Sequence, residues 1–445
     1  MAIDPSARVR RVAAGLTTIS AATVVAVPAF VAVPGLVTSV DDRMSGREGA
    51  VSHTAAPRLT ETTGTAAPVF DQTVTPQVHD APVRDPHLRG RPSLAGRSTP
   101  QPVAGYGVVG ATWKGSAPAG MSLRVRTREA GHWSGWRDLP VHDDHGPEPG
   151  SAEAAAATRS GSDPMVVGDV GAVQLRAISS TGEAPRDLEL NVVDPGFSTT
   201  DRYAADRYAG AAAPSYDLAV ASASGAGTTS FTTYTGPRLA GQDATTATPV
   251  ATVSAPKPRI RSRAAWGANE RLRSGSPRYS NGFRGAFVHH TVNANGYSRA
   301  QVPAIIRGIY AYHTQRLGWS DIGYNFLLDR FGRIWEGRYG GVARHVIGAH
   351  TLNYNEETFA MSAIGNFDIS SGIPNRRMVA AYGALFGWKL GLDGIPAQSH
   401  QWLNGRWLPA IQGHRDVGQT ACPGRYLYAK MPAIRSAAAA AQNAQ

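Results

Sequence analysis

The sequence contains one cysteine, Cys422, among 445 residues. A single thiol excludes a disulfide within the chain, so the fold must be stable without such a cross-link. Three interpretations of Cys422 remain open: a buried inert thiol, a bridge to another molecule, or a metal ligand or nucleophile. Composition alone favours the first, and the residues around Cys422 bear on the choice.

Charged residues are also scarce. Only 17% of the chain is charged, yet the formal net charge is +11 because Lys and Arg outnumber Asp and Glu. No basic cluster with interleaved aromatic residues is found, which argues against a nucleic-acid-binding protein. If the chain is exported, as its N-terminus indicates below, this charge favours anionic wall polymers or phospholipid surfaces as partners.

Long apolar runs are missing beyond the N-terminus. Residues 12–40 carry no charge and follow three arginines, which is the pattern of a secretory signal. About 20 apolar residues could also anchor a chain in a bilayer, but two prolines disfavour an uncleaved anchor. We expect residues 1–40 to be a signal peptide, and the mature protein to be secreted and without a stable transmembrane span.

Composition divides the middle of the chain into three segments. Residues 41–102 have few large apolar side chains and predict a disordered spacer, and residues 198–257 predict a flexible linker. Between them, residues 103–197 hold alternating runs such as "MSLRVRTR" and "LELNVV", which predict a small all-β domain whose ligand is unknown. Its insert "HGPEPGSAEAAAATRSGSD" predicts a long loop, and Trp133 and Trp136 are interpreted as packing residues rather than a sugar-stacking pair.

Residues 258–445 alternate between strand and helix patterns. The segments "GAFVHHT" and "FAMSAIGNF" predict strands, and "YNFLLDRFGRIWEG" predicts a hairpin. Amphipathic patterns predict helices after Gln301, over residues 376–390 and from Arg425. The order indicates an α/β fold with a central mixed sheet flanked by helices.

Histidines and the lone cysteine suggest a metal site in this domain. A histidine at the end of the first strand, His414 and the thiolate of Cys422 form a set of ligands that suits zinc. Three protein ligands leave a fourth position for water, whose pKa zinc lowers to about 7. Neighbours on a strand point to opposite faces, so His289 and His290 cannot both reach one ion. The spacing of His414 and Cys422 alone is too common to prove the site.

Several motifs occur in the order found in one family. They are "SRAAWGA", "FVHHT", "GWSDIGYNFLLDRFGRIWEGR", "HVIGAHTLNYN", "SAIGNF" and "GHRDVGQTACPG". In these motifs the chain resembles the peptidoglycan recognition protein family, which overlaps the zinc-dependent N-acetylmuramoyl-L-alanine amidases of bacteria and phage. The resemblance covers about residues 258–434. A β-rich module ahead of it is similar to the arrangement in exported actinobacterial members.

The resemblance implies a Zn²⁺ site with two catalytic residues beside it. The implied ligands are His289, His414 and Cys422. Tyr324 is implied to hold the attacking water or polarise the scissile carbonyl, and Thr420 to donate to a developing oxyanion. In the family, members without activity typically lose the cysteine ligand, so the presence of Cys422 with His289, His414 and Tyr324 favours an active enzyme. At the position of Thr420, phage members carry lysine and cell-surface members often carry threonine.

Other polar residues receive weaker predictions. His350 and Asn325 are predicted to bind substrate, although a core position for His350 is equally compatible with the sequence. Glu336 is interpreted as a general base or as the partner of Arg338, with the second preferred. Asp416 is predicted to orient a loop or a ligand histidine.

Two functions follow, with a third kept open. The first is a secreted zinc amidase that hydrolyses the lactyl-L-alanine amide bond between the glycan and the stem peptide of peptidoglycan. The alternative is a non-catalytic protein that binds the same muropeptide. In the third, the β-rich domain is an adhesion module and the principal functional unit.

Overall fold

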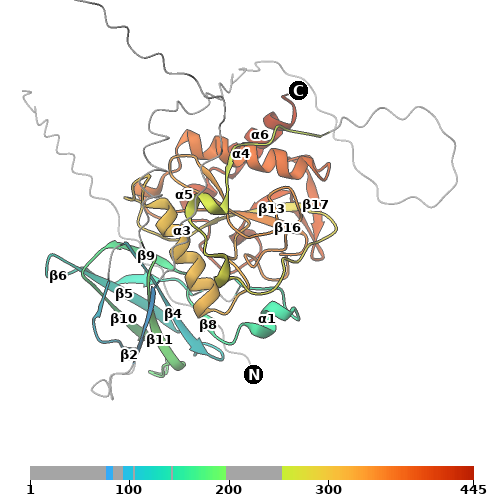
Figure 1. Ribbon diagram of the computed structural model, residues 1–445. Coiled ribbons are helices and arrows are strands. Elements are labelled where there is room, and N and C mark those ends of the chain that lie inside the picture. The colour runs from blue at the N-terminus through green and yellow to red at the C-terminus, as the bar shows by residue number, and fades with distance from the viewer. Residues whose placement is uncertain (1–76, 84–93, 104–105, 142–143, 197–252, 445) are drawn as a thin grey trace, which may run out of the picture. The chain divides into compact units, whose positions relative to one another are not determined.

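The computed structural model of the protein describes two domains, one rich in strands and one of α/β type (Figure 1). The predicted signal peptide, residues 1–40, lies outside the described residues, as do most of the predicted spacer and linker. Within the described part of the chain, no helix is long and apolar enough to cross a bilayer. The described residues are 77–83, 94–103, 106–141, 144–196 and 253–444.

The β-rich domain consists of short antiparallel strands and one short helix. The strands are β1 (Gln77–Pro82), β2 (Leu94–Arg97), β3 (Gln101–Pro102), β4 (Tyr106–Lys114), β5 (Ser122–Glu129), β6 (His132–Trp133), β7 (Arg137–Leu139), β8 (Ser160–Gly161), β9 (Met165–Asp169), β10 (Ala172–Ile178) and β11 (Arg186–Asp194). The helix is α1 (Ala152–Ala156). One sheet has the order β1-β11-β4-β8 with β9 also paired to β4, and the other has the order β2-β10-β5-β6 with β3 and β7 at its sides.

The two sheets enclose a core, so the predicted β-rich domain is confirmed, and its architecture is a sandwich. Along β11, Leu188, Leu190 and Val192 point into this core, as the alternation predicts. Two corrections concern the limits of the domain. Strands β1, β2 and β3 precede residue 103, within the predicted spacer, because pairing with β11 and β10 orders them despite their few apolar residues. The predicted loop after residue 144 contains α1 and β8.

The α/β domain is built on one mixed sheet, as predicted. Its strands are β12 (Ile260–Arg261), β13 (Gly285–His290), β14 (Phe326–Leu328), β15 (Ile334–Glu336), β16 (Thr358–Ala363) and β19 (Ile411–Gly413), in the order β12-β15-β14-β16-β13-β19. Only β14 and β15 pair antiparallel, and they form the predicted hairpin. A separate hairpin joins β17 (His400–Leu403) to β18 (Arg406–Pro409).

Helices cover both faces of this sheet. The helices are α3 (Val302–Ala311), followed by a π-helical turn (Tyr312–Arg316), α4 (Arg376–Gly391), α5 (Arg425–Tyr428) and α6 (Met431–Gln442). The core on one face contains residues of α4 and α6, and the core on the other face contains residues of α3 (Figure 1). The side chain of Gln301 accepts from the N–H of Ser298 at 2.6 Å, which fixes the chain just before α3.

The α3 face is completed by the β-rich domain. Val108 and Val193 of that domain belong to the same buried cluster as Ile305 and Ile309 of α3. The hydroxyl of Tyr312, in the π-helical turn, donates to carbonyl oxygens of the β-rich domain at 3.0 Å. The two domains therefore share a continuous hydrophobic core instead of being joined only by a linker.

Candidate metal centre

Strand β13 separates its two neighbouring histidines. His289 stands opposite Ser362, and Ser362 stands opposite Leu327, which packs on the α3 face. His290 is in register with Ala363 and through it with Leu328, which packs on the α4 face. Side chains alternate along a strand, so only His289 lies on the α3 face. His290 instead accepts from the N–H of Phe367.

His414 follows directly after β19, which runs parallel to β13. It begins a single 3₁₀ turn that ends at Asp416. One carboxylate oxygen of Asp416 accepts from the N–H of Gly413 at 2.9 Å, and the other accepts from the hydroxyl of Tyr428. Asp416 thus fixes the turn that carries His414, which is the loop-orienting role predicted for it.

Cys422 is placed by hydrogen bonds to its sulfur and to its backbone. The N–H of His290 donates to Sγ at 3.4 Å. The N–H of Cys422 donates to the Thr420 hydroxyl at 3.0 Å, and Arg415 donates to the Cys422 carbonyl. Thr420 therefore helps to hold the cysteine backbone, while its predicted part in catalysis stays a prediction.

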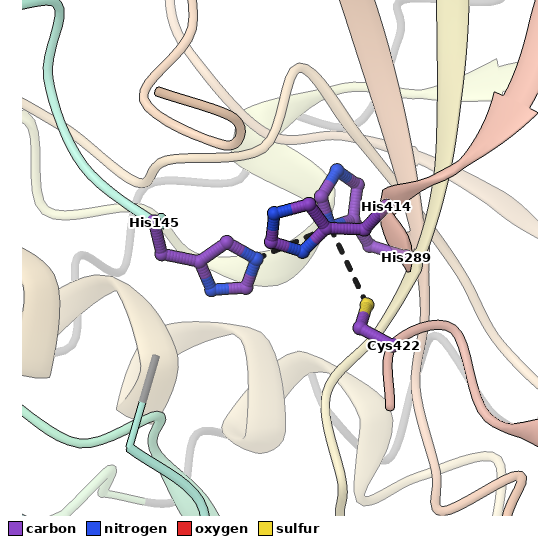
Figure 2. A group of neighbouring side chains, drawn as sticks. All are labelled: His145, His289, His414 and Cys422. Atoms are coloured by element: carbon purple, nitrogen blue, oxygen red, sulfur yellow. Dashed lines mark hydrogen bonds between the residues drawn. The ribbon is translucent and has the colours of Figure 1, made fainter. Parts of the chain in front are cut away.

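Four side chains converge at this position: the three predicted ligands His289, His414 and Cys422, and His145 from the β-rich domain (Figure 2). One ligand atom from each lies within 4.8 Å of all the others. His145 Nε2 is 3.2 Å from His289 Nδ1, and Cys422 Sγ is 3.5 Å from the same nitrogen. Zinc bonds of about 2.0–2.3 Å at tetrahedral angles separate two nitrogens by about 3.3 Å and a nitrogen from sulfur by about 3.6 Å. These spacings fit a tetrahedral zinc ion.

The protonation of His289 also fits a metal ligand. Thr351 Oγ1 lies 3.2 Å from His289 Nε2 and can accept a hydrogen bond from a proton on that nitrogen, which leaves the Nδ1 lone pair directed at the cluster. Burial, and then the neighbouring His414 and His145, hold the pKa of His289 well below its usual range. A neutral imidazole is the form that binds metal.

Cys422 also has a shifted pKa, but its pKa is raised whereas that of His289 is lowered. Its side chain is fully buried, and burial raises its pKa well above the usual value although the N–H of His290 opposes this. A thiolate is costly in such a place unless a cation lies beside it. A divalent metal ion would supply that charge, so the residues present fit zinc.

Tyr324 lies next to the cluster. Its ring centroid is 5.7 Å from that of His289 and 6.2 Å from that of His145. Burial, reinforced by the Asp163 carboxylate, raises the pKa of Tyr324 well above its usual value. The phenol is therefore protonated at neutral pH and can donate a hydrogen bond.

The two residues predicted to bind substrate are both buried. His350 is fully buried and contacts Thr351 through Nδ1 at 3.1 Å. Asn325 donates to the carbonyl of Val346 at 2.7 Å and accepts from the N–H of Ala360 at 2.9 Å. These contacts give Asn325 a structural role between β16 and a neighbouring loop, and substrate binding by either residue stays a prediction.

One predicted ion pair is wrong. Arg338 pairs with Glu153 of α1 at 2.7 Å, not with Glu336, and both partners are largely buried. The backbone carbonyl of Glu336 accepts from the Trp266 indole, while burial raises the pKa of its carboxyl. The sequence favoured the near neighbour because Glu153 lies in a different domain.

Three further residues near the cluster come from the β-rich domain and were not predicted from the sequence. His145 and Asp163 are the first and last residues of the segment interpreted as a loop, and Asp144 comes directly before it. Asp144 Oδ2 is 3.3 Å from His414 Nε2, and Asp163 Oδ1 is 3.0 Å from His145 Nδ1. No repeated spacing or motif links these residues to the α/β domain, so only the folded arrangement reveals them. Thr351 follows the predicted His350 and could have been considered with it.

Comparison with known families agrees with this architecture. The family described as "N-acetylmuramoyl-L-alanine amidase" matches residues 279–425. Peptidoglycan-recognition protein SC2 of Drosophila melanogaster is 32% identical over 169 residues, which is 38% of this chain and 82% of the fly protein. The chain belongs to the peptidoglycan-recognition protein family. The predicted family is thereby confirmed.

Two further proteins match a similar share of this chain at a similar sequence identity. A peptidoglycan recognition protein of Trichoplusia ni is 32% identical over 141 residues, covering 32% of this chain and 69% of its own length. The solved structure of wild-type Drosophila PGRP-LB is 30% identical, covers 39% of this chain and 92% of its own, and has a TM-score of 0.33. A second family, described as "Rv3811 N-terminal galactose-binding domain-like", matches residues 55–199 and so includes the β-rich domain.

Proposed function

We propose that the protein is a secreted, wall-associated, zinc-dependent N-acetylmuramoyl-L-alanine amidase. It hydrolyses the amide bond between the lactyl group of the glycan and the L-alanine of the stem peptide. The observation that carries the proposal is the convergence of His289, His414 and Cys422, with Tyr324 beside them, in a member of a family that includes such amidases. The 3.5 Å between Cys422 Sγ and His289 Nδ1 fits two ligands of one zinc ion.

Each residue of the site has a defined task in this proposal. His289, His414 and Cys422 hold the ion, which when bound supplies a Lewis acid for the scissile carbonyl and lowers the pKa of water. Thr351 keeps His289 in the tautomer that exposes Nδ1. Tyr324, protonated and buried, donates a hydrogen bond to the substrate carbonyl as negative charge develops on its oxygen.

Thr420 has an indirect part in this proposal. Its hydroxyl accepts from the N–H of Cys422 and so orients the ligand, and it retains a proton that can be donated to the oxyanion. A neutral hydroxyl stabilises an oxyanion less than an ammonium group does. His350 and Asn325 would act on the substrate site indirectly: His350 contacts Thr351, which contacts His289, and Asn325 joins Val346 to Ala360 of β16.

A second candidate function is recognition of peptidoglycan without cleavage. It is supported by the burial of the site, because His289, His414 and Cys422 are all fully covered. It is supported also by relatives that are named for recognition. In this alternative the metal has a structural role only.

The test is incubation of the whole zinc-loaded chain with purified peptidoglycan, followed by mass spectrometry of the soluble products. A His145→Ala variant is included because His145 also belongs to the cluster, and Cys422→Ser is the matched inactive control. Stem peptides that begin with L-alanine, absent with a chelator and absent for Cys422→Ser, support the amidase. If neither the wild type nor His145→Ala releases them but both sediment with the wall, the recognition function replaces it.

The β-rich domain also offers a surface for an anionic wall polymer. Arg126 lies over the rings of both Trp133 and Trp136 at 4.5 and 4.7 Å, and Arg176 lies over Trp136 at 4.5 Å. Burial lowers the pKa of both arginines, and repulsion from neighbouring arginines such as Arg97 lowers it further. An anion that binds across these neighbouring arginines would reduce the repulsion between their positive charges.

Salt dependence tests this surface. Sedimentation of the whole chain with cell walls should weaken as NaCl is raised from roughly 50 to 500 mM, because salt screens the attraction between exposed charges. Replacing Arg126 and Arg176 by Gln should weaken it at low salt. Binding that is unchanged by both treatments would assign wall attachment to the α/β domain alone.

A further inference from the structure

His145 reaches the metal centre from the other domain. It lies between β7 and α1, and its Nε2 is 3.2 Å from His289 Nδ1 (Figure 2). Its ring stacks on that of His414, with centroids 4.4 Å apart and an angle of 7° between the planes. A zinc ion held by His289, His414 and Cys422 would therefore have a third imidazole within bonding reach.

The orientation of His145 is fixed by its own domain. Asp163, just before β9, places Oδ1 3.0 Å from His145 Nδ1, and the two side chains are only 9% and 7% exposed. The N–H of Asp163 donates to the carbonyl of Pro140, which holds the carboxylate in place. Histidines that bind metal commonly donate their second nitrogen to a carboxylate, which directs the free lone pair at the ion. Asp163 and His145 form such a pair.

We propose that His145 is the fourth protein ligand of the zinc ion, and that the β-rich domain thereby keeps the amidase latent. This inference rests on the proposed function. A catalytic zinc site keeps one position open for water and substrate, whereas four protein ligands make a closed site. In this chain the fourth position is filled by a residue from outside the α/β domain, so the site opens only when His145 leaves.

The segment around His145 is attached along the α/β domain. The carbonyl of Asp144 accepts from the N–H of Leu352 at 2.9 Å. Asn355 donates to the carbonyl of Gly146 at 3.1 Å and to Glu148 at 2.8 Å. With the buried pair of Glu153 and Arg338, these contacts form a strap, residues 144–153, that covers the metal centre.

Closure explains the burial of the ligands. His289, His414 and Cys422 have no exposed surface, and His145 is almost as well covered. A glycan strand with its stem peptide cannot reach atoms that are sealed in this way. Substrate access requires displacement of the strap, and the release of His145 would free the position that water needs.

The test compares the whole chain with its His145→Ala variant, both loaded with Co²⁺ in place of zinc. His132→Ala, an exposed histidine of the same domain, is the control. Acetohydroxamate, a small metal-binding probe, should change the visible absorption of His145→Ala and leave the wild type and His132→Ala unchanged. A wild type that responds to the probe as strongly as His145→Ala would overturn the proposal.

Zinc binding gives a second measurement that does not depend on activity. Removal of His145 should weaken zinc binding by more than the 10- to 100-fold that is typical when an outer partner of a ligand is lost. Asp163→Asn keeps the size of the side chain and should weaken zinc binding by about 10- to 100-fold. X-ray absorption of the zinc-loaded wild type should show three imidazoles and one sulfur. Two imidazoles, or equal zinc affinity in all variants, would contradict the assignment.

Amidase activity separates the two proposals. A minor open state is typically populated at about 0.1–10%, so His145→Ala should release stem peptides about 10 to 1,000 times faster than the wild type. If the probe binds His145→Ala but no variant releases stem peptides, the latent metal site stands and the amidase proposal fails. If the wild type and His145→Ala release them equally fast, the amidase stands and latency is refuted.

Discussion

The face of the central sheet that packs against α4 and α6 is covered by the helices of its own domain. The opposite face is covered by α3 and then by a second domain, whose Val108 and Val193 complete the core. The candidate metal centre lies on this second face. The difference suggests that α4 and α6 stabilise the fold. The β-rich domain, as proposed above, would also control the access of substrate to the metal centre.

The adjacent histidines of β13 give the strongest test of this difference. His289→Ala should remove a metal ligand and lower zinc affinity by more than about 100-fold, with loss of any zinc-dependent activity. His290→Ala keeps the backbone N–H that contacts Cys422 and should bind zinc normally. It should cost about 1–3 kcal/mol of stability, because the buried N–H of Phe367 loses its acceptor. Zinc titration and thermal unfolding check both; equal zinc loss in the two variants would refute the assignment of faces.

The pair of Glu153 and Arg338 tests the attachment of the cover. Glu153→Ala leaves a buried guanidinium without its carboxylate and should destabilise the protein by about 3–5 kcal/mol. The control is Glu356→Ala, which removes an exposed ion pair with Arg278 and should leave the unfolding temperature nearly unchanged. Thermal unfolding at neutral pH measures both. A similar small shift in the two variants would mean that the strap is not held by this pair.

Two helical glycines compare the covers directly. A Cβ on Gly308 of α3 would lie 2.3 Å from Val108 Cγ2 of the β-rich domain, and one on Gly383 of α4 would lie 2.5 Å from Ala437 Cβ of α6. Each Gly→Ala change should cost about 1–3 kcal/mol through overpacking. Only Gly308→Ala should also let acetohydroxamate reach the Co²⁺ ion, as the visible spectrum would report. An equal response from Gly383→Ala would show that the two faces do not differ.

Acidification should weaken the cover gradually. Burial opposes ionisation of Glu153, but Arg338 and the N–H of Ser320 outweigh it and hold the pKa below its ordinary value of 4.5. The carboxylate therefore stabilises the folded protein above about pH 4.5, and this contribution is lost as the pH falls through the lower, folded-state value. The difference in unfolding free energy between the wild type and Glu153→Gln should shrink below pH 4.5. A constant difference down to pH 3 would exclude this contribution.

Much of the α/β domain follows from local patterns in the sequence. Alternating and helical periodicities located the β14–β15 hairpin, β16 and α4, because each of these elements buries one side of its own residues. The order of the motifs, through the family resemblance, identified His289, His414 and Cys422 as candidate metal ligands. The choice of His289 over His290 needed only the alternation of a strand.

The contribution of the β-rich domain could not be predicted in this way. His145 and Glu153 stand in a segment rich in Gly, Ala, Ser and Pro, where no periodicity marks a buried residue. Their partners His289 and Arg338 are far away in sequence, so the pairing depends on how two domains pack. For the same reason, Glu336, which is close in sequence, was predicted as the partner of Arg338 in place of Glu153.

The order of the two domains along the chain has a consequence for how the protein is made. Chains are synthesised from the N-terminus, and domains generally fold as units in that order. The β-rich domain, with His145 paired to Asp163, would therefore fold before Cys422 joins the cluster. In the proposed latent amidase, His145 would then close the metal site as soon as that site is assembled.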